Sequence, residues 1–109
     1  HMIEVIYKRG RHSLSVRGHA YSGVAGHDLV CASASILAYT FIANVQNAER
    51  QWDDMPEARY IVKEGLVKVN CAPPADKAEA LSVILDGIVT GFSLLADSYP
   101  DNISIRILK

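Results

Sequence analysis

Five short stretches of the chain alternate between hydrophobic and polar residues, and two longer stretches are almost wholly apolar. A period of two is typical of a strand with one buried face. The alternating stretches are residues 3–9, 12–17, 58–63, 66–71 and 103–107. Gly10 interrupts the first two and Glu64-Gly65 separates the next two, so each pair predicts a β-hairpin. The residues expected to face a core are Ile3, Val5, Tyr7, Leu14, Val16, Val67, Val69, Cys71, Ile103, Ile105 and Ile107.

The two apolar stretches predict long helices. The first runs from about Leu29 to about Glu49, with Asp28 as a candidate N-cap. The second follows Pro73-Pro74, and Asp76 with Glu79 three residues later resembles a capping box. Gly87 and Gly91 are four residues apart in this helix, and would let another backbone come close on that side.

The order of elements is therefore strand, strand, helix, strand, strand, helix, strand. This order predicts an α+β fold, a two-layer sandwich in which two helices cover one face of a mostly antiparallel sheet. Residues 3–109 are expected to form a single domain, and His1-Met2 reads as a cloning remnant ahead of the native start. One small sheet cannot cover two such apolar helices on all sides. We therefore expect a homodimer in which the helices supply much of the interface.

Charge and cysteine content narrow the class of protein. Eleven basic and twelve acidic residues give a net charge of -1, so we expect no direct nucleic-acid binding. A basic face of the sheet could meet an acidic partner, although a solvated face is the preferred interpretation. Its outward residues would be Lys8, Arg17, Arg59, Lys63, Lys68 and Arg106. Each apolar helix falls short of a membrane span, and two cysteines without a signal-like segment indicate a reducing cytoplasm.

One stretch of the chain carries candidate chemistry. His19 follows the end of the second strand, and Cys31 lies twelve residues later near the start of the first helix. With Asp28 as N-cap, Cys31 would be the third helical residue, where unpaired N–H groups and the helix dipole favour a thiolate. Gly23 and Gly26 would bend the intervening loop so that His19 could act as a base.

Several residues near this pair have more than one interpretation. Asp28 either caps the helix, which we rank first, or orients the His19 ring as the third member of a triad does. Ser35 lies one turn after Cys31 and could hydrogen-bond near the thiolate or simply pack. We assign Cys71 to the core. A zinc site from His19, His27 and Cys31, with His12 as a fourth ligand, has a spacing unlike the common ligand pairs.

The motif resembles a known family. Gly18-His19-Ala20, then Gly26, then the run from Asp28 to Ser35 is similar to the signature of the bacterial ribosomal-processing cysteine proteases. That signature has a GHA triplet, a glycine-containing loop and a D-[IL]-V-C-A-x-x-S helix start. The resemblance implies a cytoplasmic, dimeric enzyme without cofactor or metal. It also implies Cys31 as nucleophile and His19 as base, with Asp28 and Ser35 as neighbouring motif positions.

Three hypotheses follow. The first is a thiol endopeptidase with a Cys-His dyad. By the resemblance it removes the N-terminal extension of a large-subunit ribosomal protein precursor, with the Gly23–Gly26 loop closing over the peptide. The alternative is a non-catalytic dimeric module that binds a ribosomal protein or an assembly factor. A thiol-based redox sensor is a third option, although no resolving cysteine is evident.

Overall fold

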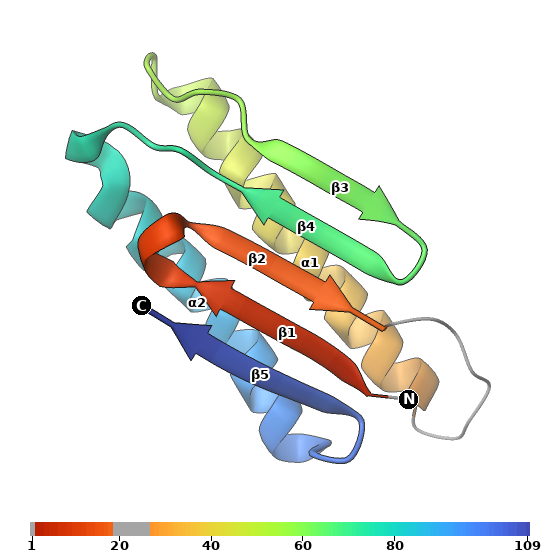
Figure 1. Ribbon diagram of the computed structural model, residues 1–109. Coiled ribbons are helices and arrows are strands. Elements are labelled where there is room, and N and C mark those ends of the chain that lie inside the picture. Colours follow the sequence, from red (N-terminus) through yellow and green to blue (C-terminus); the bar gives the residue numbers. More distant parts are fainter. Residues whose placement is uncertain (1, 19–26) are drawn as a thin grey trace.

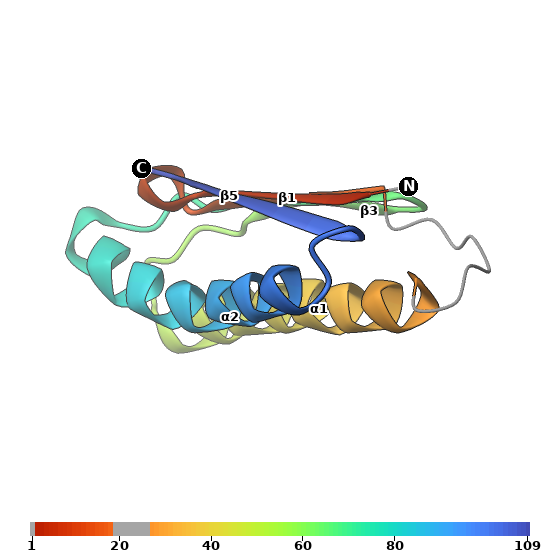
Figure 2. The same cartoon turned by 90° about the horizontal axis from the view of Figure 1, so that it is seen from below.

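The protein is a sandwich of two layers, a five-stranded sheet and a pair of helices (Figures 1 and 2). The computed structural model describes residues 2–18 and 27–109, with only the backbone of His27 and Asp28. The strands are β1 (Ile3–Lys8), β2 (Ser13–Arg17), β3 (Arg59–Lys63), β4 (Leu66–Asn70) and β5 (Ile103–Leu108). The helices are α1 (His27–Gln51) and α2 (Ala78–Ser98), with 3-10 turns η1 (Arg9–Arg11) and η2 (Ala75–Lys77). The predicted fold class and element order are confirmed.

The strand order in the sheet is β3-β4-β2-β1-β5. Both predicted hairpins form, with Lys8 opposite Ser13 in the first and Lys63 opposite Leu66 in the second. Gly65 has a φ of 75°, the left-handed conformation that the tight second turn requires. All neighbouring strands are antiparallel except β1 and β5, which are parallel. The connection through α2 therefore returns the chain to the edge of the sheet beside its first strand.

The core lies between the two layers. Alternate strand residues point toward the helices, and α1 meets them with residues spaced three or four apart, as one helix face requires. The buried residues of α1 are Val30, Cys31, Ala34, Ala38, Phe41, Val45 and Ala48. At the centre, the rings of Tyr7 and Phe41 meet edge to face with centroids 6.2 Å apart. The predicted core face of β5 is only partly buried, since Ile107 is 56% exposed at the sheet edge.

The predicted helix starts need correction. Helix α1 begins at His27, so Asp28 is its second residue and not its N-cap. The chain enters α2 through the η2 turn, and Lys77 at its N-cap position makes no side-chain capping bond. The prediction that Asp76 and Glu79 form a capping box is therefore wrong. Glu79 instead forms an ion pair with Arg9, a contact between elements far apart in sequence.

The two glycines of α2 differ in their surroundings. A Cβ atom on Gly91 would lie 2.6 Å from Cδ2 of Leu37, so this glycine makes room for an α1 side chain. A Cβ atom on Gly87 would meet nothing within 4 Å. The predicted close approach therefore occurs at Gly91, toward a side chain, and is absent at Gly87 within the described residues.

Candidate functional site

Cys31 is the fifth residue of α1, so it lies at the start of the second helical turn. The prediction that it is the third helical residue is wrong. It is 9% exposed and belongs to the buried cluster between the layers. In an α-helix, the N–H of the fifth residue donates to the carbonyl of the first. The N–H of Cys31 is therefore inside the helical ladder, and the unpaired donors at this end come from earlier residues.

Gly18, the first residue of the GHA triplet, is required by the fold. Its φ is 84°, and a Cβ atom there would lie 2.8 Å from the Met2 carbonyl oxygen. Its N–H donates to the carbonyl of Gly65 over 3.0 Å, which ties the exit of β2 to the β3–β4 turn. The end of β2 and the start of α1 lie at the same end of the molecule, one in each layer (Figures 1 and 2).

The remaining predicted site residues fall mostly outside the described part of the chain. His19, Gly23 and Gly26 lie outside the described residues, as does the side chain of Asp28. Ser35 is partly buried one turn after Cys31 on α1. The pairing of Cys31 with His19 and the alternative role of Asp28, orienting the His19 ring, therefore stay predictions.

A second cysteine and histidine come together at the opposite end of the sheet. The Cys71 N–H donates to the His12 carbonyl over 3.1 Å, and both residues are buried. His12 Nε2 lies 2.9 Å from the Ala78 carbonyl and 2.9 Å from Ser82 Oγ. Because a carbonyl only accepts, this ring nitrogen carries a proton that is already donated. The His12 side chain therefore serves to hold β2 against α2.

The thiol of Cys71 is also unsuited to catalysis. Burial, with a smaller contribution from the charge of Glu49, raises the pKa of Cys71 to about 12. The reactive thiolate is therefore scarce near neutral pH. This agrees with the assignment of Cys71 to the core.

His12 lies between η1 and β2. The start of β2 and the start of α1 are at opposite ends of the molecule (Figure 1), so His12 cannot join Cys31 in a metal site. Among the described residues, no three His, Cys, Asp or Glu side chains are close enough to hold a metal ion.

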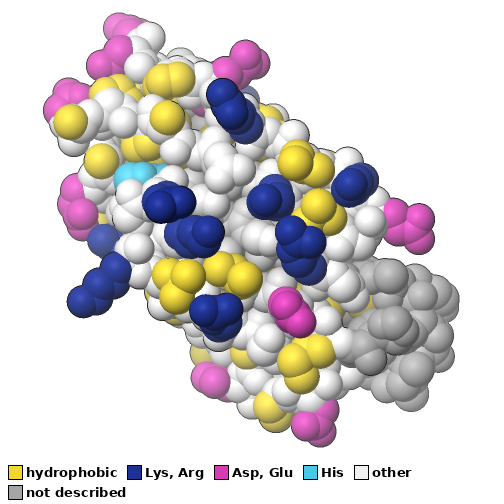
Figure 3. Space-filling model, viewed as in Figure 1, with side chains coloured by type: hydrophobic (Ala, Val, Ile, Leu, Met, Phe, Trp, Pro, Cys, Tyr) yellow, Lys and Arg dark blue, Asp and Glu magenta, His cyan; other side chains and the backbone are white. Residues whose placement is uncertain are grey.

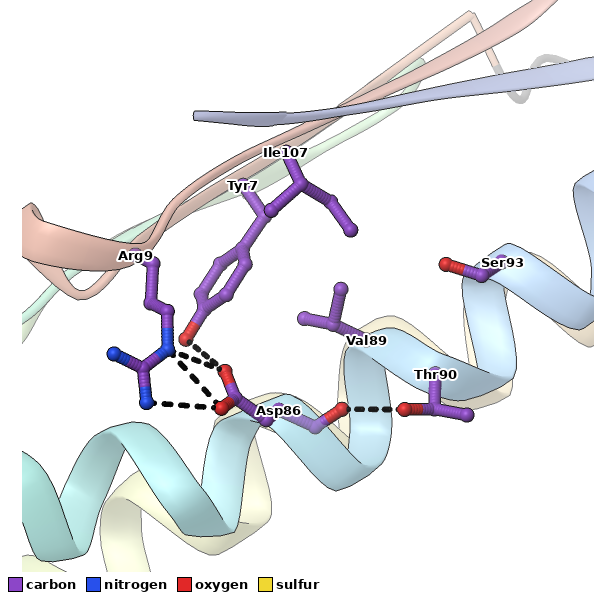
Figure 4. A pocket seen from close by; sticks show the side chains of 7 residues that line it. All are labelled: Tyr7, Arg9, Asp86, Val89, Thr90, Ser93 and Ile107. Carbon is purple, nitrogen blue, oxygen red and sulfur yellow. Dashed lines mark hydrogen bonds and ion pairs between the residues drawn. The ribbon is translucent and has the colours of Figure 1, made fainter. Parts of the chain in front are cut away.

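A polar cluster that the sequence analysis did not predict lies between β1 and α2 (Figure 4). Asp86 accepts hydrogen bonds from Arg9 Nε over 3.1 Å and from the Tyr7 hydroxyl over 3.3 Å. Burial and the neighbouring Asp86 raise the pKa of Tyr7 above its usual value. The cluster borders a cavity of about 280 Å³ that Val89, Thr90, Ser93 and Ile107 also line.

This cluster has a structural role. The Asp86 carboxylate forms an ion pair with Arg9 and accepts a hydrogen bond from the Tyr7 hydroxyl, so these contacts join α2 to β1 and η1. The signal for it was present in the sequence, because Asp86 is the one charged residue within 81–96. A lone charge on an apolar helix indicates a place where a partner can lie opposite, and Arg9 is that partner here.

Comparison with known families tests the resemblance of the motif. The sequence profile described as cysteine protease Prp matches residues 2–104, nearly the whole chain. The chain belongs to the Prp family of cysteine proteases. The predicted family is therefore confirmed. The comparison with curated proteins finds no match.

Solved structures agree with this family at the level of the fold. SMU.848 from Streptococcus mutans is similar with a TM-score of 0.69 and 26% identity, over 98% of this chain and 94% of that one. The ribosomal processing protease Prp from S. aureus, in complex with a substrate peptide, has a TM-score of 0.70 and 22% identity. That match covers 97% of this chain and 99% of the S. aureus protein. The same S. aureus protease with a covalently linked product peptide has a TM-score of 0.65 and 22% identity.

Proposed function

We propose that this Prp-family protein is an endopeptidase that removes the N-terminal extension of a large-subunit ribosomal protein precursor. The observation that carries the proposal is the family match over residues 2–104, which includes the GHA triplet and the start of α1 with Cys31. The S. aureus relative is a ribosomal processing protease that holds a substrate peptide in one structure and a covalently linked product peptide in another.

In the proposed reaction, the thiolate of Cys31 attacks the scissile carbonyl and a carbon–sulfur bond forms. Protonated His19 gives its proton to the leaving amine as the carbon–nitrogen bond breaks. Water, deprotonated by His19, then hydrolyses the thioester and restores the thiol. The N–H groups of the residues before Cys31 at the α1 start are proposed to stabilise the oxyanion, since the first four donors of a helix have no intrahelical partner.

The neighbouring motif residues have supporting roles in this proposal. Asp28, inside the first turn of α1, is left to orient His19 or to interact with the helix dipole. Ser35, one turn after Cys31, is partly buried and is proposed to hydrogen-bond near the sulfur. The Gly23–Gly26 loop is proposed to order over the bound peptide. No metal or cofactor enters the reaction, and the site of action is proposed to be the cytoplasm.

The test is cleavage of a peptide that spans the junction between the extension and the mature ribosomal protein, with products identified by mass. Cys31→Ala and His19→Ala should each reduce cleavage to the uncatalysed level. Cys71→Ala is the matched control, since it removes the other buried thiol, and should retain activity. Cleavage by a folded Cys31→Ala protein would refute the proposal. Binding of the peptide without cleavage by the wild-type protein would favour the non-catalytic module.

We also propose that the outer faces of the helices form a homodimer interface. Large hydrophobic side chains are exposed there, among them Leu29, Ile36 and Leu94, the last two each 63% exposed. An apolar groove of about 380 Å³ runs between α1 and α2, with Ile36, Leu37 and Leu94 in its lining. Exposed apolar patches of this kind mark interaction sites.

A bilayer is the competing cover for these helices. By length and composition alone, Leu29–Gln51 and Ala75–Ser98 are each long and apolar enough to cross a membrane. The expectation that the two helices are too short for a membrane span is therefore wrong. The inner face of each helix, however, packs against the sheet. This favours a second copy of the chain, and not a bilayer, as the partner of the outer faces.

Sedimentation of the purified protein should give twice the mass of one chain. Ile36→Glu should give a monomer, whereas Ile61→Glu, which changes a 46% exposed residue on the far side of the sheet, should not. A wild-type monomer, or a protein that partitions into vesicles, would contradict the dimer.

A further inference from the structure

The face of the sheet opposite the helices is strongly basic. Its side chains are those of the strand residues that alternate with the core positions, so they point away from α1 and α2. The cations of this basic face are Lys8, Arg17, Arg59, Lys63, Lys68 and Arg106. Lys and Arg side chains gather across the strands in the space-filling view, while most acidic side chains lie at its rim (Figure 3).

The near-zero net charge conceals this separation. The basic face carries six of the eleven Lys and Arg residues and one of the twelve acidic residues, Glu4. Five cations and eleven acids are therefore left for the rest of the chain. The total charge, from which no nucleic-acid binding was expected, is thus a poor guide to the field over this face.

The cations of the basic face lack ion-pair partners in the part of the chain that the structure describes. None of the six forms an ion pair with a residue that the structure describes. The register places Arg17 opposite Glu4, and the residues directly opposite the other five are uncharged. For example, Lys68 lies between Ser15 and Ile61. The fold thus spaces the cations so that no two are direct cross-strand neighbours, which limits their mutual repulsion.

The centre of the basic face is a hollow of about 190 Å³. Lys8, Arg17 and Lys68 line it together with the polar groups of Ser13, Ser15 and Asn70 and the side chain of Ile6. Ser13 donates a hydrogen bond to Asn70 Oδ1 over 2.9 Å, which holds these two side chains in place. The hollow therefore offers three cations around neutral hydrogen-bonding groups.

This arrangement fits a phosphate backbone better than an acidic protein. The anchor residues of protein interfaces are most often Trp, Tyr and Arg. The outward positions of the five strands hold arginines and four aliphatic residues, Ile6, Ile61, Leu66 and Leu108, but no aromatic residue. The same absence disfavours single strands, whose bases stack on aromatic rings. Double-stranded RNA is recognised through its phosphates and 2′-hydroxyl groups across a wide, shallow groove. Ser13, Ser15 and Asn70 can hydrogen-bond such hydroxyls.

We propose that the basic face binds double-stranded RNA through its backbone, without sequence preference. The face lies on the opposite side of the molecule from the exposed helix faces (Figure 2), so a helix-mediated dimer would leave it open. The proposal does not depend on the protease activity, because none of these residues belongs to the Cys31 motif.

The test is fluorescence anisotropy of a labelled 20-bp RNA duplex with the full chain. If four cations each contact a phosphate, a slope of about -0.9 per contact predicts about 150-fold weaker binding at 200 mM than at 50 mM salt. Lys8→Gln, Arg17→Gln and Lys68→Gln together should reduce the slope by about three. Lys68→Gln alone should weaken binding several-fold, whereas the charge-matched Arg50→Gln on α1 should leave it unchanged.

Several outcomes would overturn the proposal. They are no binding at 50 mM salt, equal weakening by Arg50→Gln, equal affinity for a DNA duplex of the same sequence, and tighter binding of a polyglutamate peptide than of RNA. Thermal melting by circular dichroism shows whether each variant is folded. Because all the substituted side chains lie at the surface of the sheet or of α1, the melting temperatures should stay close to that of the wild type.

Discussion

The two cysteines should differ sharply in their rates of alkylation near neutral pH. Cys71 is 8% exposed and Cys31 is 9% exposed, so accessibility alone would give similar rates. Burial raises the pKa of the Cys71 thiol to about 12. Cys31 lies in the family motif near the start of α1, and as the nucleophile it must supply thiolate at working pH. Alkylating reagents attack the thiolate, so the two rates report directly on this difference.

The magnitude follows from the pKa of Cys71. At pH 7.5 its thiolate fraction is about 3 in 100,000, against about one in ten for an ordinary thiol with a pKa of about 8.5. This is a deficit of roughly 3,000-fold. A thiolate with a higher pKa is intrinsically more nucleophilic. With a Brønsted coefficient of about 0.45, the Cys71 thiolate should react roughly 40-fold faster than the thiolate of the ordinary thiol, which offsets part of the deficit. Cys71 should therefore react about 100-fold more slowly than an unperturbed thiol, and burial slows it further.

The assay is iodoacetamide labelling followed by peptide mass mapping, with Cys31→Ser and Cys71→Ser as single-cysteine controls. Cys31 should label at least 100-fold faster than Cys71, and the Cys71 rate should rise about tenfold per pH unit up to pH 10. Equal slow rates at both residues would refute the assignment of Cys31 as an activated thiol. Fast labelling of Cys71 in the folded protein would refute the physical account of its burial.

Two further predictions concern stability. Gly87→Ala should raise the free energy of unfolding by about 0.5–1 kcal/mol, because alanine is the better helix former and the new methyl group meets open space. Gly91→Ala should gain less or lose stability because Leu37 must move, and urea denaturation measures both; an equal gain at Gly91 would contradict the tight α1–α2 contact. The raised pKa of Cys71 means that the folded state keeps a proton which the unfolded chain loses above about pH 9. The contribution of Cys71 to the free energy of unfolding is therefore fully present below that pH. It is lost as the pH rises toward about 12, at up to about 1.4 kcal/mol per pH unit. Cys71→Ala should have a shallower slope in denaturation curves from pH 8 to 11, and an unchanged slope would contradict the assignment.

The local elements of this protein follow from its sequence. Alternation along 3–9 and 12–17 with Gly10 between them was sufficient to predict the first hairpin, because pleating places every second side chain on one face. The family motif also lies in one continuous stretch, so it could be recognised without a fold. The exact helix starts could not be predicted, because a cap depends on which backbone groups the neighbouring chain leaves unpaired. At α2 the η2 turn takes the place of the side-chain cap expected from Asp76.

Contacts between distant segments were decided only by the tertiary structure. Three features depend on residues that are more than fifty positions apart in the sequence. They are the parallel pairing of β1 with β5, the contacts of Asp86, and the difference between the surroundings of Gly87 and Gly91. The basic face is the clearest case, since its six cations come from all five strands and are gathered by the register. Periodicity determines which face of an element a residue occupies. Which elements become neighbours depends on how the apolar faces are buried together, and that is a property of the whole chain.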